Sequence, residues 1–341
     1  MMKPTEERQA GSSDNENLIR FRVNMAEGFQ AAMSVRWKAS SKLSLVISLA
    51  CFLSLPCTAF PQKHPRPPEA ELLEIGPSKI EVPKRAPAEI KIVSYNIRWR
   101  GAAELRELIR FLKDDAEVGG ATIIGLQEVD RNKKRTQNVN TIKLIAAELG
   151  KYYAWAAPPV PQADREEETG VAILSSYPIS DVRRLILPHE GPGGRRRVAL
   201  GATITIPGAS IRVYSVHAET RISIQNKMNQ LRAVLDDLAQ HPQDMSVVIL
   251  GDFNTWEPDA VEKTSALFAS ANFYTPFKND QETFWRRVLS ILITLKLDWI
   301  WLRDLEVTGH GVDEKICISD HWPLWTMVRV PEKHLDHTAA R

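Results

Sequence analysis

The sequence predicts an α/β protein with one domain, because strand-like and helix-like segments alternate along most of the chain. Runs of β-branched and aromatic residues with the length of strands recur from Ile90 onward. Stripes of leucine, isoleucine and methionine at helical spacing lie between these runs. No further proline-rich linker interrupts residues 90–330, so we expect them to form one domain rather than two.

The individual elements follow from these two periodicities. Six strands are expected, at KIVSYNI (91–97), ATIIGLQ (121–127), GVAILSS (170–176), SIRVYSVH (210–217), SVVILGD (246–252) and LDWIWL (297–302). Three helical stripes are formed by Leu105, Leu108, Ile109 and Leu112, by Ile142, Ile145 and Leu149, and by Ile224, Met228, Leu231, Leu235 and Leu238. Gly150 and Pro242 end the second and third helices, and Pro258 is expected to open a fourth. We interpret these stripes as core faces without a chemical role.

Residues 1–60 are interpreted as a leader that contains a signal peptide. Lys42 and two further basic residues precede a run of twenty residues without a charge, and the apolar stretch 43–59 ends on small residues at Ala59. A positive flank, an apolar stretch and a small-residue exit are typical of a secretory signal peptide, so we expect export to the periplasm or the medium. The alternative is that residues 43–60 remain as a membrane anchor, since about 20 residues can span a bilayer.

The other flanks and the composition limit the class of protein. Residues 61–89 contain seven prolines and no apolar periodicity, which predicts an extended linker, and residues 331–341 are interpreted as a tail. The chain has 44 Lys and Arg against 42 Asp and Glu, a net charge of +2, and 43% of its residues are hydrophobic. This excludes a disordered chain, a multi-span membrane protein and a histone-like nucleic-acid binder. Any attraction of an anionic substrate must therefore come from local clusters of charge.

Polar residues that can bind metals or transfer protons recur at the ends of the predicted strands. In α/β proteins such positions face the crevice in which ligands bind. One such residue alone is more often a turn or a helix cap, but a whole set at strand ends is hard to explain as independent caps. The set comprises Asn96, Gln127-Glu128, His217, Asp252 with Asn254, Asp298, and Ser319-Asp320-His321.

Seven motifs give this set a family resemblance. They are YNI, LQEVD, GVAILSSYPI, VYSVH, GDFN, LDWIW and SDHWPL. In order and approximate spacing the chain resembles the endonuclease/exonuclease/phosphatase superfamily, which has the deoxyribonuclease-I-like fold. The resemblance covers about residues 90–330 and implies an α/β (α+β) domain: a four-layered sandwich of two mixed β-sheets flanked by helices. It also implies a hydrolase that cleaves a phosphodiester or phosphomonoester bond with a metal-activated water.

The resemblance assigns the metal site to oxygen ligands. Glu128 is implied as the main ligand of a Mg²⁺ ion, with Asn96 and Asp320 as further ligands. Mg²⁺ prefers hard oxygen ligands and water, Mn²⁺ can replace it, and the absence of a cysteine and histidine cage argues against zinc. Many relatives carry an acidic ligand two residues after the Asn. This chain has Arg98 there, so we expect metal binding to depend more on Glu128.

The resemblance also implies catalytic roles for five residues. Asp252 is expected to orient or deprotonate the attacking water, with Asn254 fixing its carboxylate or the phosphate. His217 and His321 are expected to contact the phosphoryl oxygens. Asp298 is expected to hydrogen-bond His321, which sets the tautomer of that imidazole and raises its basicity.

Two basic clusters are candidates for substrate binding. Arg131 follows Glu128 closely, and Arg197 closes a run of three arginines. Guanidinium groups can hold a phosphate, although a solvated surface explains both clusters equally well. The substrate class stays open between a nucleic acid, a nucleotide and a lipid headgroup. The alternatives are thus an exported endonuclease or exonuclease, a sphingomyelinase-like or phosphoinositide-type lipid phosphoesterase, and a non-catalytic scaffold of the same fold.

The segment VLSILITL (288–295) is unusually apolar for a loop. A buried strand or helix is the favoured interpretation, and an interfacial element that contacts a membrane beside a lipid substrate is the alternative. Eight residues are too few to span a bilayer. Membrane contact is therefore an alternative for both the leader and this segment, and we expect the protein to be a monomer.

Overall fold

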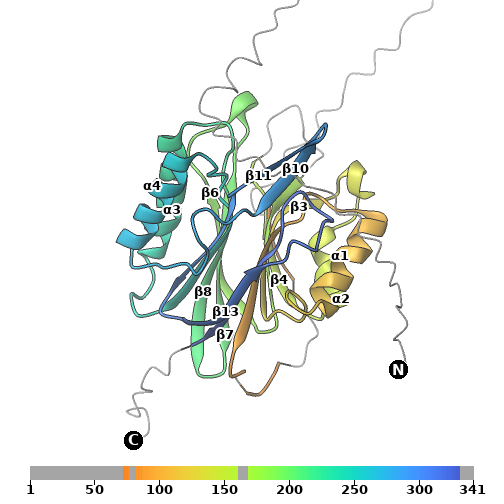
Figure 1. The fold of residues 1–341 in the computed structure, drawn as a ribbon. Helices are drawn as coiled ribbons and strands as arrows, with labels where there is room; N and C mark the ends of the chain where they lie inside the picture. The colour runs from red at the N-terminus through yellow and green to blue at the C-terminus, as the bar shows by residue number, and fades with distance from the viewer. Residues whose placement is uncertain (1–71, 77–81, 86, 160–167, 331–341) are drawn as a thin grey trace, which may run out of the picture.

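The computed structural model describes residues 72–76, 82–85, 87–159 and 168–330. The predicted leader and tail lie outside the described residues, as does most of the predicted linker. Within the described ranges, no helix is long and apolar enough to cross a membrane. Two mixed β-sheets pack face to face, and a pair of helices covers the outer side of each sheet (Figure 1). The predicted four-layered sandwich is therefore confirmed.

The first sheet has seven strands. In chain order they are β1 (Leu73–Gly76), β2 (Ile90–Asn96), β3 (Ile123–Arg131), β4 (Tyr152–Ala156), β5 (Glu168–Ser175), β13 (Glu306–Val312) and β14 (Leu324–Arg329). Their order across the sheet is β1-β4-β5-β3-β2-β14-β13. β2 and β3 run parallel, and every other neighbouring pair in this sheet is antiparallel.

The second sheet has five strands. They are β6 (Ile179–Ile186), β7 (Val198–Ile206), β8 (Ala209–His217), β9 (Ser246–Asp252) and β12 (Asp298–Arg303). They lie in the order β12-β9-β8-β7-β6, with β8 and β9 parallel. Two further strands, β10 (Phe284–Val288) and β11 (Ile291–Leu295), form a separate hairpin, and an antiparallel bridge joins Phe284 at its base to His321.

The first three helices bury most of the apolar residues of the predicted stripes. They are α1 (Ala102–Asp114), α2 (Thr141–Leu149), α3 (Ile224–Leu238) and α4 (Pro258–Ser270), with short 3₁₀ turns at Lys134–Thr136 and Pro192–Gly194. The Asn140 and Ser223 side chains accept hydrogen bonds from backbone N–H groups in the first turns of α2 and α3. Gly150 ends α2 in a left-handed conformation, with φ +61°.

Three apolar layers hold the sandwich together. The central layer lies between the sheets and contains Ile92, Ile173 and Leu250, among others. A second layer packs α1 and α2 on the first sheet, and a third packs α3 and α4 on the second. The two sheets approach each other closely at Gly125, where an added Cβ would lie 2.0 Å from the Leu250 side chain. Buried layers on both sides of each sheet explain why its central strands are continuous apolar runs in the sequence.

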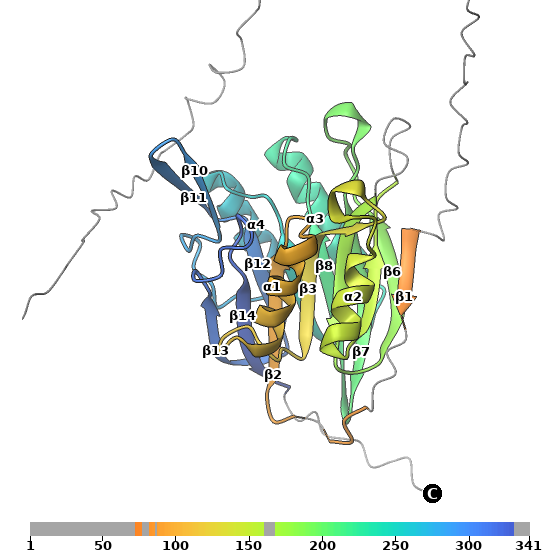
Figure 2. The same cartoon turned by 90° about the vertical axis from the view of Figure 1, so that its right-hand side faces the viewer.

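Two segments differ from the sequence prediction. β1 lies inside the predicted linker and pairs with β4, so the first sheet begins before Ile90. The favoured prediction of a buried strand or helix at residues 288–295 was right about a strand and wrong about its burial, because these residues form the tip and the second strand of the β10–β11 hairpin and the tip is exposed (Figure 2). Both segments obtain their structure from pairing, which a local apolar pattern does not reveal.

Candidate active site

Three predicted catalytic residues lie in one row across the second sheet. Asp252 is the last residue of β9 and is paired in register with His217, the last residue of the parallel strand β8. On its other side Asp252 is paired with Asp298, the first residue of the antiparallel strand β12. Residues paired across neighbouring strands point to the same face. The strand register therefore places two carboxylates and an imidazole side by side at one end of the sandwich.

The backbone around Asp252 explains the glycine and the asparagine of the GDFN motif. Gly251 has φ +134°, and a Cβ there would lie 2.0 Å from the carbonyl oxygen of Val216. Only glycine fits this position. Asn254 is left-handed, with φ +53°, which places its backbone N–H 3.0 Å from Asp252 Oδ1. Its side-chain Nδ2 donates to the Ala218 carbonyl at 3.1 Å, so Asn254 fixes the carboxylate of Asp252.

The first sheet contributes Asn96 and Glu128 from across the sandwich. Asn96, the last residue of β2, donates from Nδ2 to Asp252 Oδ2 at 3.0 Å and lies 3.5 Å from Glu128 Oε1. Glu128 sits in a bulge of β3 between Gln127 and Val129, with φ +56°. A bulge redirects the side chain that it carries. Glu128 is thus unpaired in the β3–β5 ladder, and its side chain, which is 28% exposed, lies beside the buried Asp252.

His321 and Asp298 form a hydrogen-bonded pair. His321 Nδ1 lies 2.8 Å from Asp298 Oδ2, and Thr283 Oγ1 donates to the same oxygen at 2.8 Å. The other imidazole nitrogen, Nε2, lies 3.8 Å from Asp252 Oδ2. Ser319 Oγ accepts from the His321 backbone N–H and donates to the carbonyl of Asn96 at 2.8 Å, which connects the SDH motif to β2.

The two histidines are in opposite electrostatic environments. Burial, together with the nearby charges of Arg197 and His321, lowers the pKa of His217 well below its usual value. Burial also acts to lower the pKa of His321, but the charge and hydrogen bond of Asp298, with the charge of Asp252, outweigh it and raise that pKa. At neutral pH His217 is therefore a neutral imidazole and His321 an imidazolium.

Asp252 holds its proton more tightly than a free aspartate. Burial raises its pKa, and the charges of Asp298 and Glu128 add to this, while His321 and the Asn96 hydrogen bond act against it. A carboxylate with a raised pKa is suited to accept a proton near neutral pH. The position of Asp252 between two imidazoles, 3.6 Å from His217 Nε2 and 3.8 Å from His321 Nε2, suits the same task.

Asp320 is held by Arg98 and not by the other predicted metal ligands. Arg98, two residues after Asn96, lies with its Nη1 2.8 Å from Asp320 Oδ2. Asn96 Oδ1 accepts from the Arg98 backbone N–H at 3.1 Å. Of the three predicted ligands, Glu128 therefore presents a carboxylate that no Lys or Arg side chain pairs with among the residues that the structure describes.

The charge balance of the site fits a bound cation. Asp298 is compensated by His321 and Asp320 by Arg98. Asp252 and Glu128 instead flank His217, which is neutral. The hard oxygens of these residues, with water in the remaining positions, are a donor set that Mg²⁺ prefers. A second compact cluster, of ligand atoms from Asp252, Asp298 and His321 within 4.8 Å of one another, is already internally hydrogen-bonded.

The two predicted substrate-binding arginines lie in different places. Arg197 is at the site, with Nη1 3.3 Å from His217 Nδ1 and Nε 3.1 Å from Glu219 Oε2. Arg131 is not brought to the site. It lies between Glu74 and Glu168, at 2.9 and 2.6 Å, and its guanidinium stacks over Trp155. Arg131 therefore joins β1, β3 and β5, and nothing in its surroundings supports the predicted role in substrate binding.

Three supporting residues were not assigned a role from the sequence. Glu219 is buried and binds both Arg195 and Arg197. Lys227 is buried in α3 and donates from Nζ to the Asn254 carbonyl at 2.8 Å. Thr283, described above, is the third. Glu219 follows His217 by two residues, and Lys227 lies in the predicted third helix next to Met228 of its apolar stripe.

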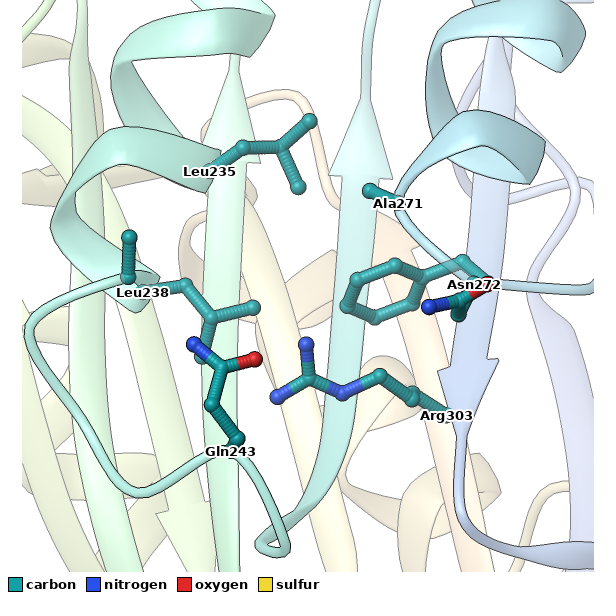
Figure 3. A pocket seen from close by; sticks show the side chains of 8 residues that line it. Leu235, Leu238, Gln243, Ala271, Asn272 and Arg303 are labelled. Atoms are coloured by element: carbon teal, nitrogen blue, oxygen red, sulfur yellow. The ribbon is translucent and has the colours of Figure 1, made fainter.

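A pocket elsewhere on the second sheet takes no part in this site. It is formed by the end of α3, the loop after α4 and Arg303 (Figure 3). Arg303 is paired with Val247 at the end of the β12–β9 ladder opposite to Asp298 and Asp252. The pocket therefore lies away from the catalytic row.

Comparison with known proteins places this geometry in a family. Residues 93–321 match the sequence model of the Endonuclease/Exonuclease/phosphatase family. The comparison with curated proteins gives no match. The fold is similar to that of an endonuclease/exonuclease/phosphatase from Beutenbergia cavernae, with TM-score 0.56, 17% identity and 72% of each chain covered. It is also similar to a family protein from Leptotrichia buccalis, with TM-score 0.55, 19% identity and coverage of 70% of this chain and 99% of that one.

A third structural neighbour is ANGEL2, a 2′,3′-cyclic phosphatase, with TM-score 0.52, 14% identity and coverage of 72% of this chain and 96% of that one. At these identities the structural likeness concerns the fold alone. The sequence match, in contrast, spans more than half of the chain and includes every motif of the catalytic row. The chain therefore belongs to the endonuclease/exonuclease/phosphatase family.

Proposed function

We propose that this protein is a Mg²⁺-dependent hydrolase that cleaves a phosphodiester bond. The family consists of metal-dependent phosphoesterases, among them nucleases and phosphatases. One observation carries the proposal: Asp252 lies within 4 Å of the imidazoles of His217 and His321, beside the Glu128 carboxylate, with which no Lys or Arg side chain of the described residues forms an ion pair. A scaffold without catalytic function has no need for this arrangement.

The chemistry follows from the side chains. Asp252 is oriented by Asn96 and by the backbone of Asn254, and its raised pKa suits it to take a proton from an attacking water. His321, held by Asp298, carries a proton on Nε2 that it can donate to a phosphoryl or leaving-group oxygen. Arg197 Nη1 donates to His217 Nδ1, so the uncharged His217 carries its proton on Nε2, which lies 3.6 Å from Asp252 Oδ2 and can donate a hydrogen bond.

Glu128 and Asn96 are the residues that would hold the cation. Mg²⁺ bound there would offset the charge of the phosphate and lower the pKa of a bound water. Arg197, fixed by Glu219, places a further positive charge beside His217. These groups supply the charge neutralisation that hydrolysis of a phosphate ester requires.

The proposal is tested by metal-dependent turnover of bis(p-nitrophenyl) phosphate, a chromogenic diester. Asp252→Asn and His321→Ala should each lower kcat by at least about 100-fold. Asp259→Asn, a change to an exposed carboxylate on α4, is the matched control and should leave turnover unchanged. Absence of Mg²⁺-dependent turnover in the wild-type chain, or wild-type turnover in Asp252→Asn, would overturn the proposal.

The substrate class is best resolved by parallel assays with Mg²⁺. Plasmid DNA, RNA, sphingomyelin, phosphoinositides and a nucleoside 2′,3′-cyclic phosphate cover the open alternatives. The cyclic phosphate is included because ANGEL2, a structural neighbour, is a 2′,3′-cyclic phosphatase. Preferential cleavage of nucleic acid would indicate a nuclease, and preferential cleavage of a lipid headgroup a lipid phosphoesterase.

We further propose that the enzyme is exported, because the apolar stretch 43–59 has the pattern of a signal peptide. N-terminal sequencing of the protein from the medium, the periplasm and the membrane fraction tests this. A new N-terminus near residue 60 is expected. An intact leader in the membrane fraction would indicate an anchor instead, and an intact leader in the cytosol would contradict export.

A further inference from the structure

The β10–β11 hairpin presents an apolar tip to the surface. Seven large hydrophobic side chains are exposed in the described ranges, and three of them occupy four consecutive positions of this tip. Val288 is 45% exposed, Leu289 93% and Ile291 53%. Soluble proteins rarely gather apolar side chains in this way without a binding role.

The turn keeps a leucine where the backbone favours another residue. Val288 pairs with Ile291, so Leu289 and Ser290 form a two-residue loop. Leu289 has φ +54°. Such loops strongly favour glycine or asparagine at a position of positive φ, and a leucine there is strained. The turn therefore carries an apolar leucine at its outermost point, although its backbone conformation favours glycine or asparagine there.

The flank of the tip is basic. Arg286 and Arg287 on β10 are exposed, and no hydrogen bond or ion pair joins their side chains to any other residue that the structure describes. The hairpin sequence FWRRVLSILITLK contains no acidic residue. Because directly paired residues share a face, Arg286 lies on the same face as Val288 and Ile291.

The base of the hairpin is attached to the catalytic residues. The Phe284 ring packs edge-on against the His321 ring, with the centroids 5.1 Å apart. The Trp285 backbone N–H donates to the Asp320 carbonyl at 2.8 Å. From this base the hairpin projects beyond both sheets (Figures 1 and 2). Whatever binds the tip is thereby held at a fixed orientation to the active site.

We propose that the hairpin tip inserts into the interfacial region of an anionic lipid bilayer. An apolar tip with a basic flank fits an acyl boundary beneath negative headgroups. The shape also favours a bilayer over a protein partner. A stable protein interface buries about 800 Å² on each partner, which is more than a two-residue turn and its flanking pair can offer.

A label at the tip tests insertion directly. The three native cysteines are replaced by serine in the full chain, and Ser290→Cys is labelled with the polarity-sensitive fluorophore NBD. Vesicles of phosphatidylcholine with about 30 mol% phosphatidylserine should increase and blue-shift its emission, and phosphatidylcholine alone should do so less. The same label at Ser180→Cys, an exposed serine of β6, should not respond. The readout is local, so it does not depend on whether the leader also holds the chain to the vesicle.

Substitutions distinguish the contribution of the apolar tip to vesicle binding from that of its basic flank. Leu289→Asn, which suits the positive φ, should weaken the labelled tip's response to vesicles by about tenfold in apparent affinity. Arg286→Gln with Arg287→Gln should remove the preference for anionic lipid. Leu144→Asn, a change to an exposed leucine on α2, is the matched control and should have no effect. Leu289→Asn should also retain turnover of a soluble diester, which shows that it is folded.

An unchanged NBD signal with anionic vesicles, or an unchanged response in Leu289→Asn, would overturn the proposal. A dimer that Leu289→Asn dissociates, without any vesicle response, would identify a second copy as the occupant and also overturn it. The vesicle assay needs no Mg²⁺ and no substrate. Failure of membrane insertion is therefore distinguishable from failure of the proposed hydrolase activity.

Discussion

Replacing Lys296 by methionine is expected to stabilise the protein, because this lysine is buried beside the active site and its Nζ has no hydrogen-bond partner among the described residues. Its Nζ lies 4.3 Å from the Trp299 ring centroid and 5.5 Å from that of Phe277. Burial lowers the pKa of Lys296 from 10.5 to about 7, although the charges of Asp298 and Asp280 act in the opposite direction. The folded state is therefore a poor environment for the ammonium group.

The size of the effect follows from the two pKa values. Each pH unit between them corresponds to about 1.4 kcal/mol, so holding the ammonium in this site costs up to about 5 kcal/mol below pH 7. The aromatic rings offset about 1–2 kcal/mol of this through cation–π contact, which the variant loses. A net gain of about 2–4 kcal/mol in the free energy of unfolding is expected, because methionine keeps the apolar stem of the side chain. For a domain of this size the Tm should rise by roughly 5–10 °C.

The sign of the pH dependence is also determined. Because the pKa of Lys296 is lower in the folded state, the unfolded chain binds more protons at this residue between pH 7 and pH 10.5. The contribution of Lys296 to wild-type stability therefore improves as the pH rises through this window. The advantage of the variant should be largest below pH 7 and should shrink toward pH 10.5.

Urea unfolding of wild type and Lys296→Met at about pH 6.5, 8 and 9.5 measures this difference. Lys263→Met, a change to an exposed lysine on α4, is the matched control and should change stability by less than about 0.5 kcal/mol. A variant that is less stable than wild type at the lowest pH would refute the reasoning. A gain that does not vary with pH would show that packing, and not charge burial, is responsible.

Two further predictions concern the catalytic row. Asp298→Asn should lower kcat by about 10²–10⁴-fold. The loss of activity at high pH should also move to lower pH. Burial lowers the pKa of His321, and Asp298 is the main group that raises it, so the variant lacks this opposing effect. An unchanged pH–rate profile would argue against a functional His321–Asp298 pair. Gly251→Ala should destabilise by more than about 2 kcal/mol in urea unfolding, since it combines positive φ with a contact 2.0 Å from the Val216 carbonyl oxygen. Gly208→Ala, with φ +83° and open space around it, isolates the backbone strain at about 1–2 kcal/mol, and equal losses in the two variants would contradict the steric explanation.

The central part of the fold could be predicted from the sequence because its strands are buried on both faces. KIVSYNI and SVVILGD correspond to β2 and β9, whose strand ends carry Asn96 and Asp252. A continuous apolar run that stops at a polar residue marks both the element and the position of a site residue. Edge strands such as β6 face the solvent on one side and contain both polar and apolar residues, so a search for continuous apolar runs does not find them.

The partner of a charged side chain could not be predicted from the sequence. Arg131 and Arg197 are alike as sequence features, since each lies in a basic cluster near a motif. Arg131 binds Glu74 and Glu168, which reach it only through the pairing of β1 with β4 and of β5 with β3. Arg197 meets His217 because β7 pairs with β8. Tertiary pairing decides which arginine is structural and which reaches the site.

The same pairing of charges supports the proposal that this site binds a cation. Three positive side chains at the site contact carboxylates: His321 contacts Asp298, Arg98 contacts Asp320, and Arg197 shares Glu219 with Arg195. Asp252 and Glu128 remain, and the imidazole between them is neutral. A phosphate anion that approaches these two carboxylates is repelled. The pKa of Asp252 is raised mainly by burial, and the negative charges of Asp298 and Glu128 add to this. A divalent cation at Glu128 would remove the repulsion and lower the pKa of Asp252, so that substrate binding and an ionised Asp252 both depend on it.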